Sequence, residues 1–164
     1  LARLAGVLRT TQAPLLVSDF QVCNEDRTQS PPRTLSRGEV SLADADAASV
    51  FVRNRIPNSC IAYRRDLLAG ITHAEDLDLY EDWDFLLQCL RTQPLAHCAG
   101  AGVVIHKSAA DAPANLRRGN GSDDRILDVM LELYRRHPAP DPQIRLARQA
   151  LLASAGVQVP LAQC

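Results

Sequence analysis

The sequence is poor in aromatic residues, nearly neutral, and without a long apolar run. Its 164 residues carry a formal net charge of -1, which argues against broad electrostatic binding to nucleic acid or to an anionic membrane. Only 4% of the residues are aromatic, so a platform of stacked rings for single-stranded nucleic acid is not expected. No stretch of about 18 apolar residues occurs, so we expect no transmembrane segment. The opening LARLAGVLRT is also too short and too polar for the apolar region of a signal peptide.

The cysteines follow no recognisable disulfide or metal-binding pattern. The five cysteines are Cys23, Cys60, Cys89, Cys98 and Cys164. Their odd number, irregular spacing and lack of a C-x-x-C pair favour free thiols in a reducing compartment, which indicates the cytoplasm. A thiol- or zinc-dependent enzyme is an alternative, with a zinc site from Cys89, His97 and Cys98, but this spacing matches no familiar zinc site.

The chain does contain an alternation of apolar strands and amphipathic helices. At this length and 46% hydrophobic residues, it fits one domain with a real core. Helices are expected over 1–10, 41–54, 64–70, 82–92, 122–137 and 143–156, and strands over 13–20, 59–63 and 101–106. Residues 24–38 are rich in turn formers and charge and predict an exposed loop. Ser122 is the expected cap of the clearest helix. The alternation favours an α/β layer structure.

The segment LYEDWDFLL, residues 79–87, places three acids around the only tryptophan, Trp83. The simpler explanation is capping, with Glu81 or Asp82 as the N-cap and Asp84 in the first turn, where the helix dipole favours acids. The alternative is that one carboxylate faces a cleft and takes a proton from a bound hydroxyl. A helix N-terminus would hold such a base ionised and lower its basicity. On this segment alone, capping is the favoured explanation.

Four segments, taken in their order along the chain, change which of these two explanations is favoured. They are LLVSDFQVCNEDR (15–27), NRIPNSCIAYRRDLLAG (54–70), YEDWDFLLQCL (80–90) and VVIHKSAAD (103–111). Together they resemble the C-terminal half of family-2 glycosyltransferases of the GT-A fold, over about residues 1–110. The resemblance implies a partial GT-A mixed sheet with flanking helices in residues 1–120, of the nucleotide-diphospho-sugar transferase type. Residues 121–164 would then form a C-terminal helical extension.

The resemblance also implies a reaction and its residues. Such enzymes move a sugar from a nucleotide-diphosphate donor to an acceptor hydroxyl with inversion, often in polysaccharide biosynthesis. By this resemblance Asp82 is the general base and Glu81 supports it near the acceptor. The strand-ending His106, with Lys107, would lie near the diphosphate or its divalent cation, Mg²⁺ or Mn²⁺. The expected partners are a nucleotide sugar and a glycan or lipid-linked glycan, at a cytoplasmic site or the inner face of a membrane.

Several of these residues also have simpler explanations. Trp83 is a candidate acceptor-binding residue by the resemblance, but its helical spacing with the apolar residues that follow favours packing beneath the helix over stacking on a sugar. Asn54 and Arg55 could line the acceptor cleft or tie down a loop, and His106 could be a hydrogen-bonded residue at a strand end. Solvated helix faces are expected for Arg64, Arg65, Arg135 and Arg136.

The main departure from the family is that these residues do not include the donor-binding half. The D-x-D motif that holds the metal would lie upstream, and residues 1–10 match the helix after it. We therefore expect a piece of a longer protein that carries only the acceptor half. The alternative function is a non-catalytic α/β interaction module without a donor site. Apolar surface left by missing strands also predicts association with a second copy.

Overall fold

The computed structural model describes residues 2–11, 13–108 and 123–164, and the chain divides into two units. The first unit takes its residues from Leu1–Asp44, Ile56–Leu67 and Leu95–Asn120. The second takes its residues from Ala45–Arg55, Leu68–Pro94 and Gly121–Cys164. The class is α/β, as expected, with a mixed four-stranded sheet in the first unit and a group of helices in the second. No helix in the described part of the chain has the length and apolar character needed to cross a bilayer.

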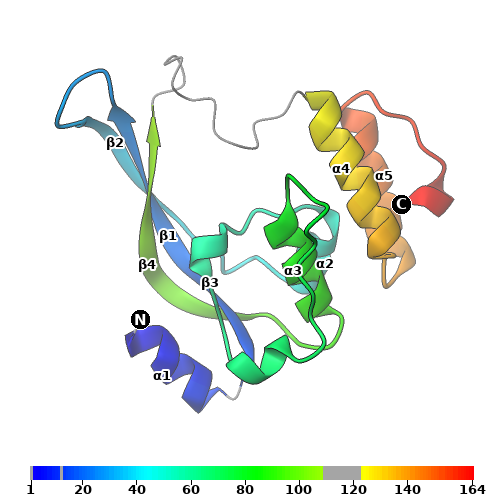
Figure 1. The fold of residues 1–164 in the computed structure, drawn as a ribbon, viewed down its shortest axis with the longest axis horizontal. Helices are drawn as coiled ribbons and strands as arrows, with labels where there is room; N and C mark the ends of the chain where they lie inside the picture. Colours follow the sequence, from blue (N-terminus) through cyan, green and yellow to red (C-terminus); the bar gives the residue numbers. More distant parts are fainter. Residues whose placement is uncertain (1, 12, 109–122) are drawn as a thin grey trace. The chain divides into compact units, whose positions relative to one another are not determined.

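Strand β1 (Leu15–Asp26) organises the first unit, because every other strand of the sheet pairs with it (Figure 1). Strands β2 (Arg33–Val40) and β3 (Ile61–Tyr63) are antiparallel to it, and β4 (Ala96–Ser108) is parallel. The apolar run at the start of β1 is fully buried, as a strand with covered faces requires. Helix α1 (Ala2–Thr10) packs against β1 and β4.

The prediction of an exposed loop over residues 24–38 is wrong in part. Strand β1 continues to Asp26, beyond the predicted end at residue 20, and β2 begins at Arg33. Strand β2 is exposed along its whole length, so it carries the polar composition of a loop and lacks the apolar alternation of a half-buried strand. Its backbone pairing with β1, from Phe20↔Val40 to Asp26↔Arg33, holds it in the sheet instead.

The parallel pairing of β1 and β4 is interrupted by extra residues in β4. Opposite the step from Ser18 to Phe20, the register moves from Cys98 to Val103. Gly100, in this bulge, has φ +90°, which a side chain rarely adopts. Its N–H donates to the Asp19 carboxylate at 2.7 Å. The A-G-A-G sequence therefore permits a bulge that sequence periodicity could not locate.

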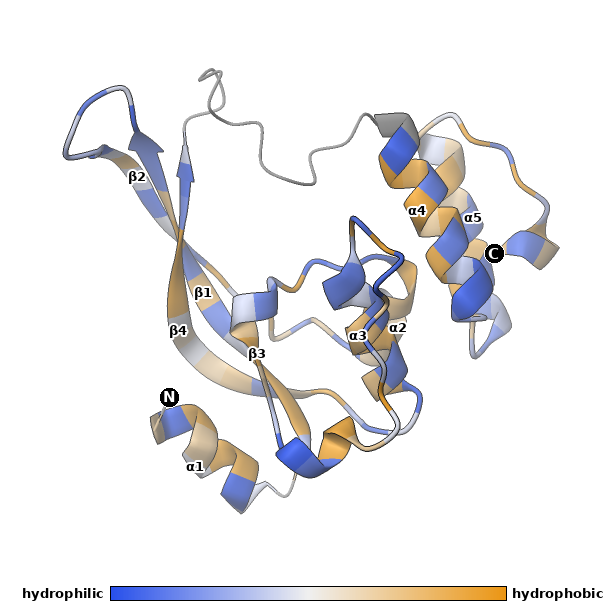
Figure 2. Cartoon of the chain, viewed as in Figure 1, coloured by the Kyte–Doolittle hydropathy of each residue, from blue (hydrophilic) through white to orange (hydrophobic). Residues whose placement is uncertain are grey.

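The second unit consists of α2 (Ala47–Val52), α3 (Glu81–Leu90), α4 (Asp123–Arg136) and α5 (Pro142–Ser154). Asp46 caps α2 in a capping box with Ser49, and Asp141 caps α5. Hydropathy alternates around α4 and α5, which is typical of helices with one packed face (Figure 2). The expected cap Ser122 lies outside the described residues. The predicted apolar face of α3 is confirmed, since Trp83, Leu86, Leu87 and Leu90 are all buried.

Candidate functional site

The start of α3 is not capped by an acid. Its N-cap is Tyr80, which makes no side-chain capping hydrogen bond and has a left-handed backbone with φ 63°. The expected N-cap role of Glu81 or Asp82 is therefore wrong, because the helix begins one residue before Asp82 and both acids lie inside its first turn. A non-glycine residue in this conformation costs about 1 kcal/mol or more, and such strain clusters at functional positions.

Asp82 is half-buried beside the exposed Glu81. Burial raises the pKa of Asp82, and the neighbouring Glu81 carboxylate raises it further, against smaller opposing contributions from backbone N–H groups. This reverses the expectation that the helix N-terminus would lower its basicity. A carboxylate with a raised pKa is a stronger proton acceptor, provided that it is ionised at the working pH.

Trp83 lies in the core of the second unit, and its side chain is 1% exposed. Its indole N–H donates to the Val50 carbonyl at 2.9 Å, and the ring makes edge contacts with Tyr80 and Tyr134. The preference for packing over sugar stacking is confirmed, since a ring this buried presents no face to a ligand. Trp83 acts by fixing the start of α3.

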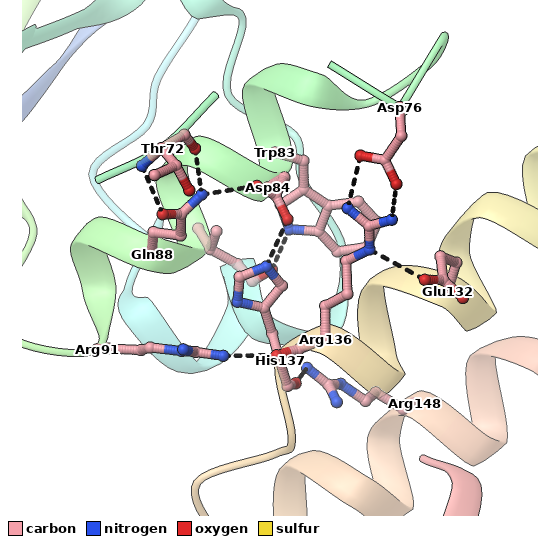
Figure 3. Close-up of polar contacts among 11 residues, drawn as sticks. Thr72, Asp76, Trp83, Asp84, Gln88, Arg91, Glu132, Arg136, His137 and Arg148 are labelled. Atoms are coloured by element: carbon pink, nitrogen blue, oxygen red, sulfur yellow. Dashed lines mark hydrogen bonds and ion pairs between the residues drawn. The ribbon is translucent and has the colours of Figure 1, made fainter. Parts of the chain in front are cut away.

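Asp84 turns inward rather than remaining a simple first-turn acid (Figure 3). Its two carboxylate oxygens contact His137 Nε2 and Gln88 Nε2, each at 2.7 Å. Gln88 also accepts from the N–H of Thr72 at 3.1 Å and donates to its carbonyl at 2.8 Å. No sequence pattern signals this network, because its members come from three separate segments.

A cavity of about 510 Å³ lies beside this network. Asp84, Gln88, Arg91, His137 and Arg136 line it together with the loop of residues 72–76. Arg136 was expected on a solvated helix face, and its side chain is in fact only partly exposed, at 28%. It forms ion pairs with Asp76 and Glu132, which raise its pKa and hold the loop against α4.

The sequence-predicted groups His106 and Lys107 lie near the end of β4, in the first unit, and Lys107 is exposed. His106 Nδ1 lies 2.5 Å from Glu25 Oε1, and this contact, more than the one with Arg27, holds the pKa of Glu25 below its usual range. Among the residues that the structure describes, Cys23, Glu25 and His106 are the one group of three that could hold a metal ion.

The hypothesis of a zinc site from Cys89, His97 and Cys98 has no support among the described residues, since these three do not form such a group. His97 Nε2 instead contacts the Asp19 carboxylate at 2.7 Å. The histidine therefore holds the start of β4 against β1 within the sheet unit.

The remaining candidates lie in the second unit. Asn54 is half-buried and Arg55 is exposed, just after α2. Glu81, Asp82 and Trp83 belong to the same unit, so these five candidates share one body. No family model matches the chain, and neither a curated protein nor a solved structure matches it.

Proposed function

We propose that the chain is the acceptor-side half of an inverting, family-2-like glycosyltransferase, with Asp82 as its general base. The observation that supports this most directly is the state of Asp82. It lies in the first turn of α3, is half-buried, has its pKa raised by burial and by Glu81, and is not used as the N-cap. A raised pKa suits a proton acceptor and has no use in capping, which stabilises an ionised acid.

In the proposed reaction, Asp82 takes the proton of an acceptor hydroxyl while that oxygen attacks the anomeric carbon of the sugar. The bond from this carbon to the diphosphate breaks on the opposite face, and its electron pair leaves with the diphosphate. Glu81 raises the proton affinity of the base through its charge. In this proposal Asn54 and Arg55, which lie in the same unit as Asp82, hold the acceptor. A cytoplasmic location, at the inner face of a membrane for a lipid-linked acceptor, is part of the proposal.

A divalent cation, Mg²⁺ or Mn²⁺, would neutralise charge on the leaving diphosphate. Among the described residues, the one cluster that contains His106 also contains the Cys23 thiol, whereas Mg²⁺ selects oxygen ligands. This cluster does not fit Mg²⁺, so the proposed reaction contains no step through a metal held by it.

The test is an assay of the full reading frame that encodes the chain. Release of nucleoside diphosphate is measured for a panel of nucleotide sugars, with glycan and lipid-linked acceptors. Asp82→Asn is expected to lower kcat by about 10²- to 10⁴-fold, the usual contribution of a general base. In the wild type, kcat/KM should fall as the pH drops through the raised pKa of Asp82, because the base must be ionised, and Asp82→Asn should remove this dependence.

Asp128→Asn is the matched control, since Asp128 is an exposed acid on α4 of the same unit. It should leave kcat unchanged. A wild-type rate in Asp82→Asn, or a product with retained anomeric configuration, contradicts the proposal. Failure of the full protein to bind any nucleotide sugar in calorimetry would favour the interaction module instead.

A further inference from the structure

We propose that Cys23, Glu25 and His106 form a binding site for a zinc ion at the paired ends of β1 and β4. The assignment of this site does not rest on the proposed sugar transfer, and it gives His106 a metal-binding role instead of the one expected near the diphosphate. Its three ligand atoms, a sulfur, a carboxylate oxygen and a ring nitrogen, all lie within 4.8 Å of one another. Thiolate, carboxylate and imidazole are the three protein ligand types that zinc accepts.

The sheet itself brings the three side chains together. Cys23 and Glu25 are two residues apart on β1, so they point to the same face of the sheet. His106 is the register partner of Cys23 in the parallel pairing of β1 with β4. Glu25 and His106 are 81 positions apart in the sequence, so the site is set by strand register and not by a local motif.

The observed distances are close to those of a tetrahedral zinc site. Cys23 Sγ lies 3.8 Å from Glu25 Oε1, and His106 Nδ1 lies 2.5 Å from the same oxygen. The sulfur of Cys23 and the ring nitrogen of His106 lie within 4.8 Å of each other. Ligands at zinc bond lengths are roughly 3.3–3.8 Å apart, so the nitrogen–oxygen pair must open by about 1 Å, and a movement of His106 adjusts both of its distances. His106 is at the surface, with its side chain 49% exposed, so this opening does not disturb a packed core.

A supporting shell is also present around the candidate ligands. Arg27 Nε donates to Glu25 Oε2 at 3.2 Å, which leaves Oε1 directed toward Cys23 and His106. Thr34 Oγ1 lies 3.7 Å from Cys23 Sγ. Such outer contacts orient metal ligands and are a regular part of metal sites. Three protein ligands leave a fourth position for water or a small ligand, as in zinc sites that are not purely structural.

Binding requires the thiol to lose its proton. Zinc would form a bond to the Cys23 sulfur as the thiol proton leaves for solvent, and it would replace the His106–Glu25 contact by two metal–ligand bonds. Zinc binding should therefore release a proton to solvent. The thiol also makes the site selective, because Mg²⁺ and Ca²⁺ prefer oxygen ligands.

The experiment is a titration of metal-free, reduced full chain with Co²⁺, followed by competition with Zn²⁺. A thiolate–cobalt bond produces a near-ultraviolet charge-transfer band, which we expect for the wild type and which Zn²⁺, but not excess Mg²⁺, should abolish. Cys23→Ser should remove the band. His106→Gln should weaken binding by about 100-fold or more, because loss of even a supporting contact weakens metal affinity about 10- to 100-fold.

Two variants serve as controls in the same unit. Cys98→Ser removes a buried thiol of β4 outside the cluster, and Lys107→Gln changes the exposed neighbour of His106, so both should keep the band and the affinity. His106→Gln decides the question if Cys23→Ser fails to fold. The proposal is overturned if the wild type shows no thiolate–cobalt band, or if Cys23→Ser or His106→Gln binds as the wild type does.

Discussion

Asp82 and Asp84 have the same side chain and lie two residues apart, yet α3 gives them different environments. Residues two apart on a helix point in nearly opposite directions. Asp82 is half-buried next to Glu81, whereas Asp84 is buried against His137 and Gln88. Asp84 is therefore a positioning residue that joins α3 to the residue after α4, and Asp82 is the acid to which the proposed function assigns the role of base.

His137 makes the stability of the protein depend on pH. Burial lowers the pKa of His137 below its ordinary value of 6.5, although Asp84 acts in the opposite direction. Arg91 and Arg148 also lower it through their charges. The unfolded chain thus binds a proton before the folded one does. The stabilising contribution is complete above pH 6.5 and is lost as the pH falls toward the folded-state pKa, with a slope of at most about 1.4 kcal/mol per pH unit.

Urea unfolding of the wild type and of His137→Gln at a series of pH values measures this effect. The wild-type free energy of unfolding should fall as the pH drops below 6.5, and the variant should show a flatter profile over that window. Identical slopes for the wild type and His137→Gln would contradict the assignment.

At the level of elements, α5 is joined to its neighbours through one buried cation. Arg148 on α5 is 0% exposed and donates to the carbonyl oxygens of Phe51, His137 and Cys164 at 2.7–2.9 Å. Its guanidinium also lies over the ring of Tyr134, 4.1 Å from the centroid. Burial lowers the pKa of Arg148 to about 10, so it remains a cation at neutral pH. One side chain therefore joins α5 to the segments that contain α2 and the end of α4.

Arg148→Met should lower the free energy of unfolding by about 3 kcal/mol or more, because three carbonyl oxygens lose a charged donor. Arg145→Met is the matched control on the same helix. Arg145 is exposed, so its replacement should change stability by less than about 0.5 kcal/mol. Both are measured by urea unfolding monitored at Trp83. If the two variants lose the same free energy of unfolding, the loss comes from methionine on α5 in general. The prediction that the Arg148 contacts stabilise the unit would then be wrong.

At the scale of the whole molecule, all five cysteines are buried and free. None of them forms a disulfide, in agreement with the free thiols predicted from the sequence, and a buried thiol outside the Cys23 cluster packs as a small apolar group. Burial raises the pKa of Cys89 to about 11, and it also raises those of Cys60 and Cys164, which further lowers thiolate reactivity.

Thiol titration tests this state. The native protein should react slowly with an aromatic disulfide reagent, and the urea-unfolded protein should release all five thiols without prior reduction. Reducing agent should leave the melting temperature unchanged, because no disulfide supports the fold. Fewer than five reactive thiols after unfolding would contradict this prediction. The native rate should fall further with zinc if Cys23 binds it.

Local sequence patterns were enough to predict the α/β class and the packed face of α3. These features repeat every few residues, so Trp83 and Leu86 could be assigned to the core from their spacing alone. The same patterns placed α1, α4 and α5 to within about two residues at most ends, the usual uncertainty of helix boundaries.

Which groups meet depends on the tertiary structure. Strand β2 has the composition of a loop because it is held by backbone pairing rather than by burial. The contacts of Asp84 with His137 and of Glu25 with His106 bring together residues 53 and 81 positions apart. Local periodicity carries no information about such pairs, because strand register and helix packing are set by the whole chain. The role proposed for Asp82 depends on the local sequence and on the tertiary structure. The motif around Asp82 can be read from neighbouring residues, whereas its burial is produced by segments that are distant in the sequence.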